Sequence, residues 1–209
     1  TYKIAYLIDE KQFEPWSILA LTFTNKAANE MRSRIGKVVG QDRTRYLHMG
    51  TFHSIFSRIL RIEAEKLGYT KQFTIYDEAD SRSLLKNIIK EMKLDDKVYK
   101  PAGIHAKISM AKNHLILPDL YAQDQAALKR DYHNHQPEIY KIYQTYQQRC
   151  QKANAMDFDD LLVLTWRLFK EHDDIRKKYA ERFKYVLVDE YQDTNHSQYL
   201  IVKALADRF

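Results

Sequence analysis

The stretch YVLVDEYQDTN, residues 185–195, places an apolar run directly before two adjacent carboxylates, Asp189 and Glu190. A short apolar run bounded by polar residues is typical of a strand that is buried in a parallel sheet. In open parallel sheets, ligands bind at the carboxyl ends of the strands, which is where Asp189 would lie. A carboxylate there can hold Mg²⁺ against nucleotide phosphates, and Glu190 can orient or deprotonate an attacking water. The same pair also fits a plain turn or helix cap, so the choice depends on the rest of the chain.

Two strand–turn–helix patterns occur early in the chain. SILALTF (residues 17–23) predicts a buried strand, and the helix pattern after it has Gly36 where a C-cap belongs. YLHMGTF (residues 46–52) predicts the next strand, which leads into a strongly amphipathic helix. FTIYD (residues 73–77) predicts a third short strand. The opening TYKIAYLIDE (residues 1–10) predicts a helix because its apolar residues recur at helical spacing.

From Asp80 to about Ala180 the pattern is almost entirely helical, with KPAGI and LILPD interpreted as loops. Three apolar stripes mark the helices: Leu84, Leu85, Ile88, Ile89 and Met92; Ile139, Ile142, Tyr143 and Tyr146; and Phe158, Leu161, Leu162, Thr165 and Leu168. After this region FKYVLV predicts a strand again, and HSQYLIVKALA predicts a closing helix.

Strands that alternate with helices predict an α/β fold with a parallel sheet. The helical region interrupts the alternation, so we expect it to be an inserted subdomain and the two flanking pieces to share one sheet. The expected organisation is residues 1–79 as the first part of the sheet domain, residues 80–180 as the inserted helical subdomain, and residues 181–209 as the return to the sheet domain.

Composition excludes several classes of protein. With 209 residues, 44% hydrophobic and 30% charged, the chain fits a globular protein with a substantial core and not a disordered one. No apolar stretch approaches the roughly 20 residues that cross a bilayer, and the N-terminus lacks a signal-peptide pattern. A single cysteine, Cys150, excludes an internal disulfide, so we expect a cytoplasmic protein. The net charge of +6 favours polyanionic partners such as nucleic acid.

Polar residues follow the two earlier strands at the same position as the acid pair. Hydroxyls, an amide and free backbone N–H groups at a helix start can bind a phosphate backbone, and an aromatic ring can stack on a base. Each residue alone also fits a cap or a core position, but two such loops in register with an acid pair favour a nucleic-acid site. The candidate nucleic-acid contacts are Thr22, Phe23, Thr24, Asn25, Lys26, Thr51 and His53.

Phosphate chemistry also needs a cradle, for which the usual pattern is G-x-x-x-x-G-K-[ST]. None of the five glycines of the sequence belongs to that pattern. The sequence begins inside the pattern of a helix that has no residue before it as a cap, and such a loop could stand before that helix. The histidines lack the spacing of a zinc site, and Cys150 has no recognisable histidine partner for thiol chemistry.

With these residues in hand, the chain resembles a superfamily 1 DNA helicase of the UvrD/PcrA/Rep type. ILALTFTNKAANEMRSRI is similar to the family's motif Ia, GTFHSIFSRILR to its motif Ib, DFDDLL (Asp157 to Leu162) to its next short motif, and VLVDEYQDTNHSQY to its motif II. The order and separations of these motifs fit the family over the whole chain, and the combination of DEYQDTN with TFTNKAA is highly specific.

The resemblance implies a RecA-like ATPase core with an inserted helical subdomain, and ATP and Mg²⁺ as cofactors. It implies that Asp189 coordinates the magnesium ion and that Glu190 is the catalytic base. Gln192 would then belong to the nucleotide site, and Asp193, Thr194 and Asn195 would couple it to the DNA path. The seven candidate contacts above, together with Phe52, would line single-stranded DNA. The inserted subdomain would contact single-stranded or duplex DNA.

The expected function is that of a piece of an ATP-dependent DNA helicase, bacterial in origin, that translocates 3′ to 5′ on single strands and unwinds duplex. Motif III and the second RecA-like domain do not occur in the sequence, so we expect this chain alone to be inactive. The helicase part of a recombination helicase-nuclease is an alternative within the same superfamily. A non-enzymatic nucleic-acid-binding module is an alternative from a different class, and a phosphate-loop sequence directly before Thr1 would argue against it.

Overall fold

A computed structural model describes residues 1–207, and residues 208–209, the end of the predicted return segment, lie outside the described residues. The chain divides into two compact units, one formed by residues 1–60 with the segment from Leu164 onward, the other by residues 61–163. The sequence prediction placed the boundaries after residues 79 and 180, where composition changes. The boundaries of the compact units fall inside two continuous helices, α4 (Phe52–Glu63) and α10 (Asp160–Glu171).

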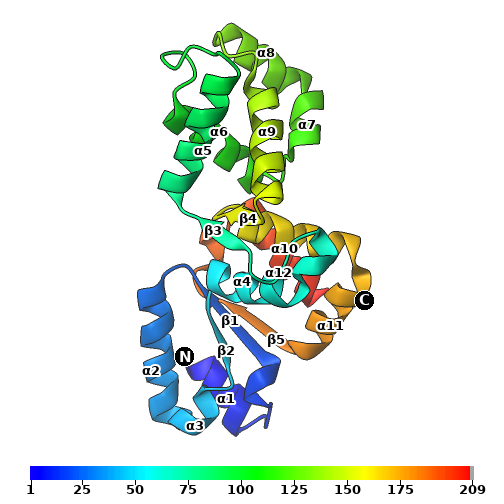
Figure 1. The fold of residues 1–209 in the computed structure, drawn as a ribbon. Coiled ribbons are helices and arrows are strands. Elements are labelled where there is room, and N and C mark those ends of the chain that lie inside the picture. The colour runs from blue at the N-terminus through cyan, green and yellow to red at the C-terminus, as the bar shows by residue number, and fades with distance from the viewer. Residues whose placement is uncertain (208–209) are drawn as a thin grey trace. The chain divides into compact units, whose positions relative to one another are not determined.

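The first unit is built on a parallel sheet of three strands, ordered β2-β1-β5 (Figure 1). These strands are β1 (Ile18–Thr22), β2 (His48–Thr51) and β5 (Tyr185–Val188). The pairing of β5 with β1 confirms the expectation that the two ends of the chain share one sheet. The prediction that β5 is buried was wrong: its residues are half-buried, because β5 is an edge strand of the described sheet, whereas all five residues of β1 are buried.

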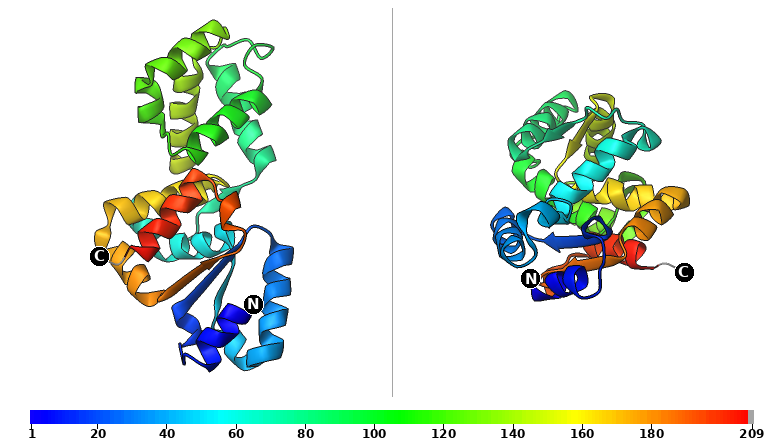
Figure 2. Two further views of the ribbon diagram at one scale, coloured as in Figure 1. Left: turned by 180° about the vertical axis from the view of Figure 1, so that it is seen from behind. Right: turned by 90° about the horizontal axis from the view of Figure 1, so that it is seen from below.

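Helices cover both faces of this sheet. Ile4 and Ile8 from the first helix and Ile35 from the second pack on Ile18 and Ala20 of the central strand. Leu19 and Leu21 alternate to the opposite face and are also fully buried. Figure 2 shows α2 and α12 on opposite sides of the sheet. The other elements of this unit are α1 (Tyr2–Asp9), η1 (Pro15–Ser17), α2 (Asn25–Val39), α3 (Gln41–Thr44), α11 (Asp173–Arg182), η3 (Tyr191–Asp193) and α12 (His196–Ala206).

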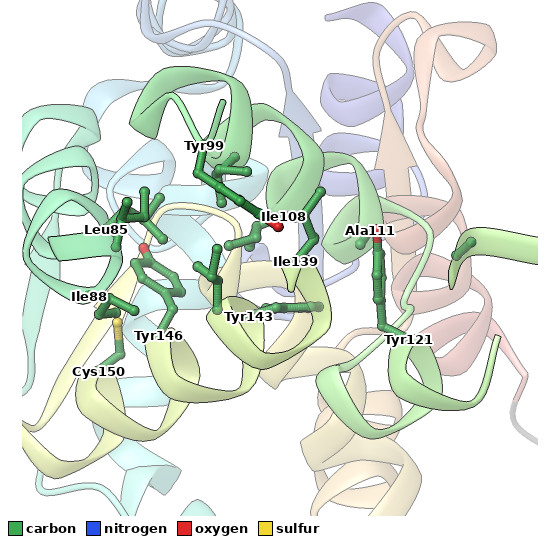
Figure 3. Close-up of a cluster of buried hydrophobic side chains, with 14 residues drawn as sticks. Leu85, Ile88, Tyr99, Ile108, Ala111, Tyr121, Ile139, Tyr143, Tyr146 and Cys150 are labelled. Carbon is green, nitrogen blue, oxygen red and sulfur yellow. The ribbon is translucent and has the colours of Figure 1, made fainter. Parts of the chain in front are cut away.

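The second unit is helical, with a two-stranded parallel sheet formed by β3 (Thr74–Tyr76) and β4 (Ala155–Asp157). Its core gathers Leu85 and Ile88 around the buried rings of Tyr143 and Tyr146, with Cys150 beside them (Figure 3). Its remaining elements are η2 (Ala64–Leu67), α5 (Glu78–Glu91), α6 (Pro101–Asn113), α7 (Pro118–Gln123), α8 (Gln125–His133) and α9 (Ile139–Lys152). Among residues 1–207, no helix is both long enough and apolar enough to span a membrane.

Several local predictions in the helical region were wrong. KPAGI and LILPD are not loops throughout, because Pro101 and Pro118 each begin a helix, α6 and α7. Proline suits the first helical position, where its fixed φ matches the helix and its missing N–H costs nothing. Strand β4 was not predicted, since three residues between helical patterns carry no usable periodicity. Phe158 does not belong to the apolar stripe of α10, because it precedes the helix and is 56% exposed.

The C-cap of α2 is Gly40 and not the predicted Gly36. Gly36 lies inside the helix, where a Cβ atom would meet the Gln41 side-chain amide at 2.7 Å, so a larger residue here would displace the end of that flexible side chain. Gly40 has φ 94° and ψ 144°, a backbone conformation that essentially only glycine adopts without strain.

We expect Gly40→Ala to lower the free energy of unfolding by about 1–3 kcal/mol, because the alanine backbone is strained at this φ although its Cβ would meet no neighbour. Gly103→Ala is the matched control, since Gly103 lies in α6 with a negative φ and equally open surroundings. That change should be neutral or stabilise by up to about 1 kcal/mol. Urea denaturation of the two variants measures both effects, and equal stabilities would contradict the role assigned to Gly40.

Candidate nucleotide and nucleic-acid site

The candidate site is located by the parallel register of the three-stranded sheet. Thr22 at the end of β1 pairs with Thr51 at the end of β2, and Leu21 pairs with Val188 at the end of β5. The backbone N–H of Asp189 donates to the carbonyl oxygen of Leu21 at 2.9 Å. The sheet thus brings the start of each predicted loop to one edge, although these residues are widely separated in the sequence.

Asp189 and Glu190 are exposed at this edge. Glu190 adopts a left-handed backbone conformation, φ 51° and ψ 50°, and its Oε2 accepts a hydrogen bond from the side-chain amide of Gln192. Within residues 1–207, neither carboxylate forms a salt bridge, and no three acidic, histidine or cysteine side chains cluster as a metal cage. This donor set fits Mg²⁺, which binds through one or two carboxylates, several waters and the phosphates of a ligand.

The residues after the acid pair hold the loop in place. The backbone N–H of Asp193 donates to the backbone carbonyl oxygen of Glu190 at 2.9 Å. The hydroxyl of Thr194 donates to the backbone carbonyl oxygen of Tyr191 at 2.8 Å. Asn195 caps α12 through a reciprocal pair of bonds with Gln198, at 2.9 and 3.0 Å. The loop from the acid pair to α12 is therefore fixed at both ends.

The loop after β1 presents the start of a long helix. Thr24 is the N-cap of α2, and its hydroxyl accepts from the backbone N–H of Ala27 at 3.1 Å. Asn25 and Lys26 follow as exposed residues in a first turn that contains no acidic side chain. Free N–H groups and the positive end of the helix dipole make such a turn suitable for a phosphate. Thr22 is fully buried, and its hydroxyl donates to the carbonyl oxygen of Thr24 at 3.0 Å, so it supports the loop from beneath.

The loop after β2 is built in a similar way. The hydroxyl of Thr51 accepts from the backbone N–H of Ser54 at 3.2 Å. Phe52 is only 1% exposed, and its ring lies 5.5 Å from that of Phe23, so Phe52 supports Phe23 from the core instead of lining a surface. His53 is half-buried in the first turn of α4, and burial lowers its pKa from 6.5 to about 4. His53 is therefore a neutral hydrogen-bonding group at pH 7.

A pocket that sequence reasoning missed lies in the second unit. Phe158 lines a cavity of about 390 Å³ together with Tyr76, His105, Ser109 and Asp159. Phe158 lies between buried neighbours, Asp157 and Asp160, which are 3% and 1% exposed. The missed signal was an aromatic residue among three aspartates directly before a helix, because a ring held among charged groups is seldom a core residue.

Comparison with known proteins agrees with this geometry. The family model described as the UvrD/REP helicase N-terminal domain matches residues 1–209. The chain is 43% identical over its whole length to a protein named ATP-dependent DNA helicase PcrA from Staphylococcus aureus, and 42% identical to the protein of that name from Staphylococcus epidermidis. It spans 28% of the length of each of these relatives.

A mixed α/β unit with a parallel sheet belongs to the class of proteins that bind their ligands at the carboxyl edge of the sheet, where the acid pair lies. Within that class, the chain belongs to the UvrD/REP helicase family and corresponds to its N-terminal domain. The resemblance recognised in the sequence is thereby confirmed.

The depressed pKa of His53 predicts how stability depends on pH. Between about pH 6.5 and 4 the unfolded chain binds a proton at His53 that the folded chain does not, so the free energy of unfolding should fall as the pH is lowered through this range. The slope of the unfolding free energy against pH reports how many more protons the unfolded chain binds than the folded chain. In His53→Gln this difference should decrease by up to one proton. His48, whose pKa is also lowered to about 4 by burial and then by Arg182 and Arg58, would keep contributing in the same direction.

Urea denaturation at several pH values between 4 and 7 measures these slopes. The exposed His133 on α8 provides the control, because His133→Gln should leave the slope unchanged if the effect comes from burial. A His53→Gln slope equal to that of the original chain would show that His53 titrates alike in both states.

Proposed function

We propose that this chain is the part of an ATP-dependent DNA helicase that carries its magnesium-binding and water-activating carboxylates and its first single-strand contacts. The full-length protein would translocate 3′ to 5′ on single-stranded DNA and unwind duplex. The observation that best supports this is the sheet register, in which Asp189 follows the strand end at Val188 beside the loops that begin at Thr22 and Thr51. Family membership supports the same reaction class, as do the relatives' names.

On the nucleotide side, Asp189 would hold the magnesium ion, which when bound neutralises charge on the ATP phosphates. Glu190 would accept the proton of the attacking water, a role suited to an exposed carboxylate without a cationic partner. The amide of Gln192 already donates to Glu190, so it can orient that carboxylate and respond to a nearby phosphate.

Coupling between nucleotide and DNA has a short path in this unit. The hydrogen bond from Asp189 to Leu21 connects the acid pair to the last residues of β1, and Thr22 connects β1 to the loop at Thr24. A movement of the acid pair on nucleotide binding would also be passed to α12. The loop between the acids and that helix is held by Asp193, Thr194 and Asn195 and would transmit it.

On the DNA side, Lys26, Asn25 and Thr24 would contact phosphate, and Phe23 would stack on a base with Phe52 behind it. The exposed ring of Phe158 would offer a second base contact, supported by Tyr76 and His105 in its pocket. Carboxylates of Asp77, Glu78 and Asp159 line the same pocket, so it suits an uncharged base better than a phosphate.

The 209-residue chain alone would not hydrolyse ATP, because its sequence contains the acid pair but no phosphate-binding glycine loop. A second candidate is a nucleic-acid-binding module without enzymatic activity, which the net charge of +6 would suit equally. The helicase part of a helicase-nuclease is a third possibility within the same family of activities. An ATP hydrolysis assay on the protein extended to the length of its relatives separates the candidates, because only the two enzymes would hydrolyse ATP. Of those two, only the helicase-nuclease would release nucleotides from DNA.

In the full-length protein, we expect single-stranded DNA to stimulate ATP hydrolysis and Glu190→Gln to abolish it while nucleotide still binds. The loss should be at least about a hundredfold in kcat, since a positioned base contributes about 10²–10⁴-fold. Steady-state phosphate release and a nucleotide-binding titration measure the two properties. An inert full-length protein would support the binding module, and normal turnover by Glu190→Gln would make the acid pair structural.

For the DNA surface, we expect Lys26→Ala to weaken single-strand binding and to reduce the slope of log K against log salt by about 0.7, the value for one phosphate contact on a single strand. Lys37→Ala is the matched control, because Lys37 is an exposed lysine in the last turn of the same helix, where phosphate binding is not favoured. Fluorescence anisotropy at several salt concentrations measures both. Equal slopes for the two variants would contradict a phosphate contact at Lys26.

A further inference from the structure

The second unit contains a cavity of about 460 Å³ that the proposed function does not use. Its lining residues come from α6, α7 and α8 and from the short stretch of chain between α6 and α7. All of them fall within residues 107–131, so the cavity belongs to one compact unit. Ligand sites commonly have volumes of about 300–1,000 Å³, with a mostly apolar lining and a few polar groups. This cavity therefore has the size of a site for a small molecule.

Two helices supply facing walls of the cavity. Lys107 of α6 contacts Asp131 of α8, with its Nζ 3.2 Å from Oδ1. Ala111 lies four residues further along α6 and Ala127 four residues earlier on α8, and both line the cavity. Residues four apart share one face of a helix, so the two alanines face the cavity one turn in from the ion pair. An alanine side chain is a single methyl group, and these two positions leave space that larger side chains would fill.

The polar end of the cavity is held by a buried carboxylate. Asp131 is almost fully buried, and its Oδ2 accepts a hydrogen bond from the hydroxyl of Tyr121 on α7 at 2.6 Å. The ammonium group of Lys107 also donates to Oε1 of Gln136 at 2.8 Å. Burial, and then the bond to Asp131, raise the pKa of Tyr121, so its hydroxyl remains a donor. Side chains from three helices meet at this carboxylate, and the end of the cavity is therefore formed before a ligand binds.

The rest of the lining is largely apolar. Ala111, Tyr121 and Ala127 are buried members of the hydrophobic core of this unit, and Ile116 packs against the same core. Met110 also lines the cavity and is exposed to solvent. A methionine side chain is flexible and makes favourable contacts between its sulfur and aromatic rings, and the ring of Tyr121 can pack against another ring. These residues fit a ligand with a flat aromatic body.

The charged side chains around the cavity leave one cation without a partner. Asp131 is neutralised by Lys107. The carboxylate of Asp124 accepts from two backbone N–H groups in the first turn of α8, at 3.0 and 3.1 Å, where the helix dipole offsets its charge. Among the described residues, by contrast, the guanidinium of Arg130 has no ion pair and no hydrogen bond. Its planar set of N–H donors matches the two oxygens of a carboxylate.

We propose that this cavity is a binding site for a small aromatic carboxylate, whose ring lies between Ala111 and Ala127 and whose carboxylate binds Arg130. The site is formed entirely by the helical unit, and it shares no residue with the candidate nucleotide and nucleic-acid site. The proposal therefore does not depend on the proposed function.

The test uses naphthoate as the probe, with its neutral amide naphthamide as the matched compound of nearly the same shape. Isothermal titration calorimetry on the full-length protein measures the affinity for each. The original protein should bind naphthoate at least about tenfold more tightly than naphthamide, because a hydrogen bond to a charged group contributes at least that ratio. Arg130→Gln should lose this preference and bind the two compounds about equally.

Matched variants show whether the ligand lies in this cavity. Lys129→Gln makes the same change of charge at the adjacent exposed residue of α8, which does not line the cavity, so it should keep the preference. Ala127→Leu places a larger side chain in the cavity and should abolish binding of both compounds. Ala111→Leu fills the cavity from the opposite wall and replaces Ala127→Leu if that variant does not fold, which circular dichroism shows.

Each outcome decides for or against the site. Loss of the preference in Arg130→Gln, its retention in Lys129→Gln and loss of binding in a folded leucine variant would together support the proposal. The proposal is overturned if the original protein binds neither compound up to the limit of their solubility. It is also overturned if naphthamide binds as tightly as naphthoate, if Arg130→Gln keeps the preference, or if a folded leucine variant binds both compounds normally. None of these results would alter the case for the proposed helicase function.

Discussion

The parallel pairing of β1 with two strands from opposite parts of the chain is the constraint on which the first unit depends. β1 is buried along its whole length, and β2 and β5 pair with it in a register that aligns Thr22 with Thr51 and Leu21 with Val188. Parallel strands run in one direction, so their carboxyl ends share one edge. Residues more than a hundred positions apart become neighbours there, and the loops acquire a common location before any ligand is considered.

The sequence predicted those features of the fold that depend on local periodicity. The strand before Asp189 and the helix after Thr24 were visible because apolar runs and cap residues are short-range signals. Features that depend on contacts were not visible. Gly36 and Gly40 are both glycines that could end a helix, and the structure places the end of α2 at Gly40. Strand β4 exists because Thr74 to Tyr76 pairs with it from a distant part of the chain. Phe158 fitted a helical stripe by spacing, but it precedes α10 and is 56% exposed.

For the candidate site, the sequence supplied the residue types, and the fold then divided them into two groups. Asp189, Glu190 and Lys26 are exposed and available to a ligand, whereas Thr22 and Phe52 lie beneath the surface and support their neighbours. A motif read as a string cannot make this division, because successive residues of a strand point to opposite sides and a loop changes direction within one residue. Residues that share a motif therefore need not share a role, and substitutions at buried positions would be expected to act through the loop's shape.

The left-handed backbone at Glu190 has an evolutionary consequence. At φ 51° glutamate strains the backbone more than glycine or asparagine would. Replacing Glu190 by either of these residues would relieve the strain and would also remove the carboxylate. The most stable residue at this position and the most useful one are then different amino acids. Selection for stability alone would favour replacing this glutamate, and the proposed role as a base would oppose that replacement. Gln12, Lys93 and Leu115 share this backbone angle and lie outside the candidate site, so the angle alone assigns Glu190 no function; its cost in stability is what the proposed chemistry has to outweigh for the glutamate to be kept.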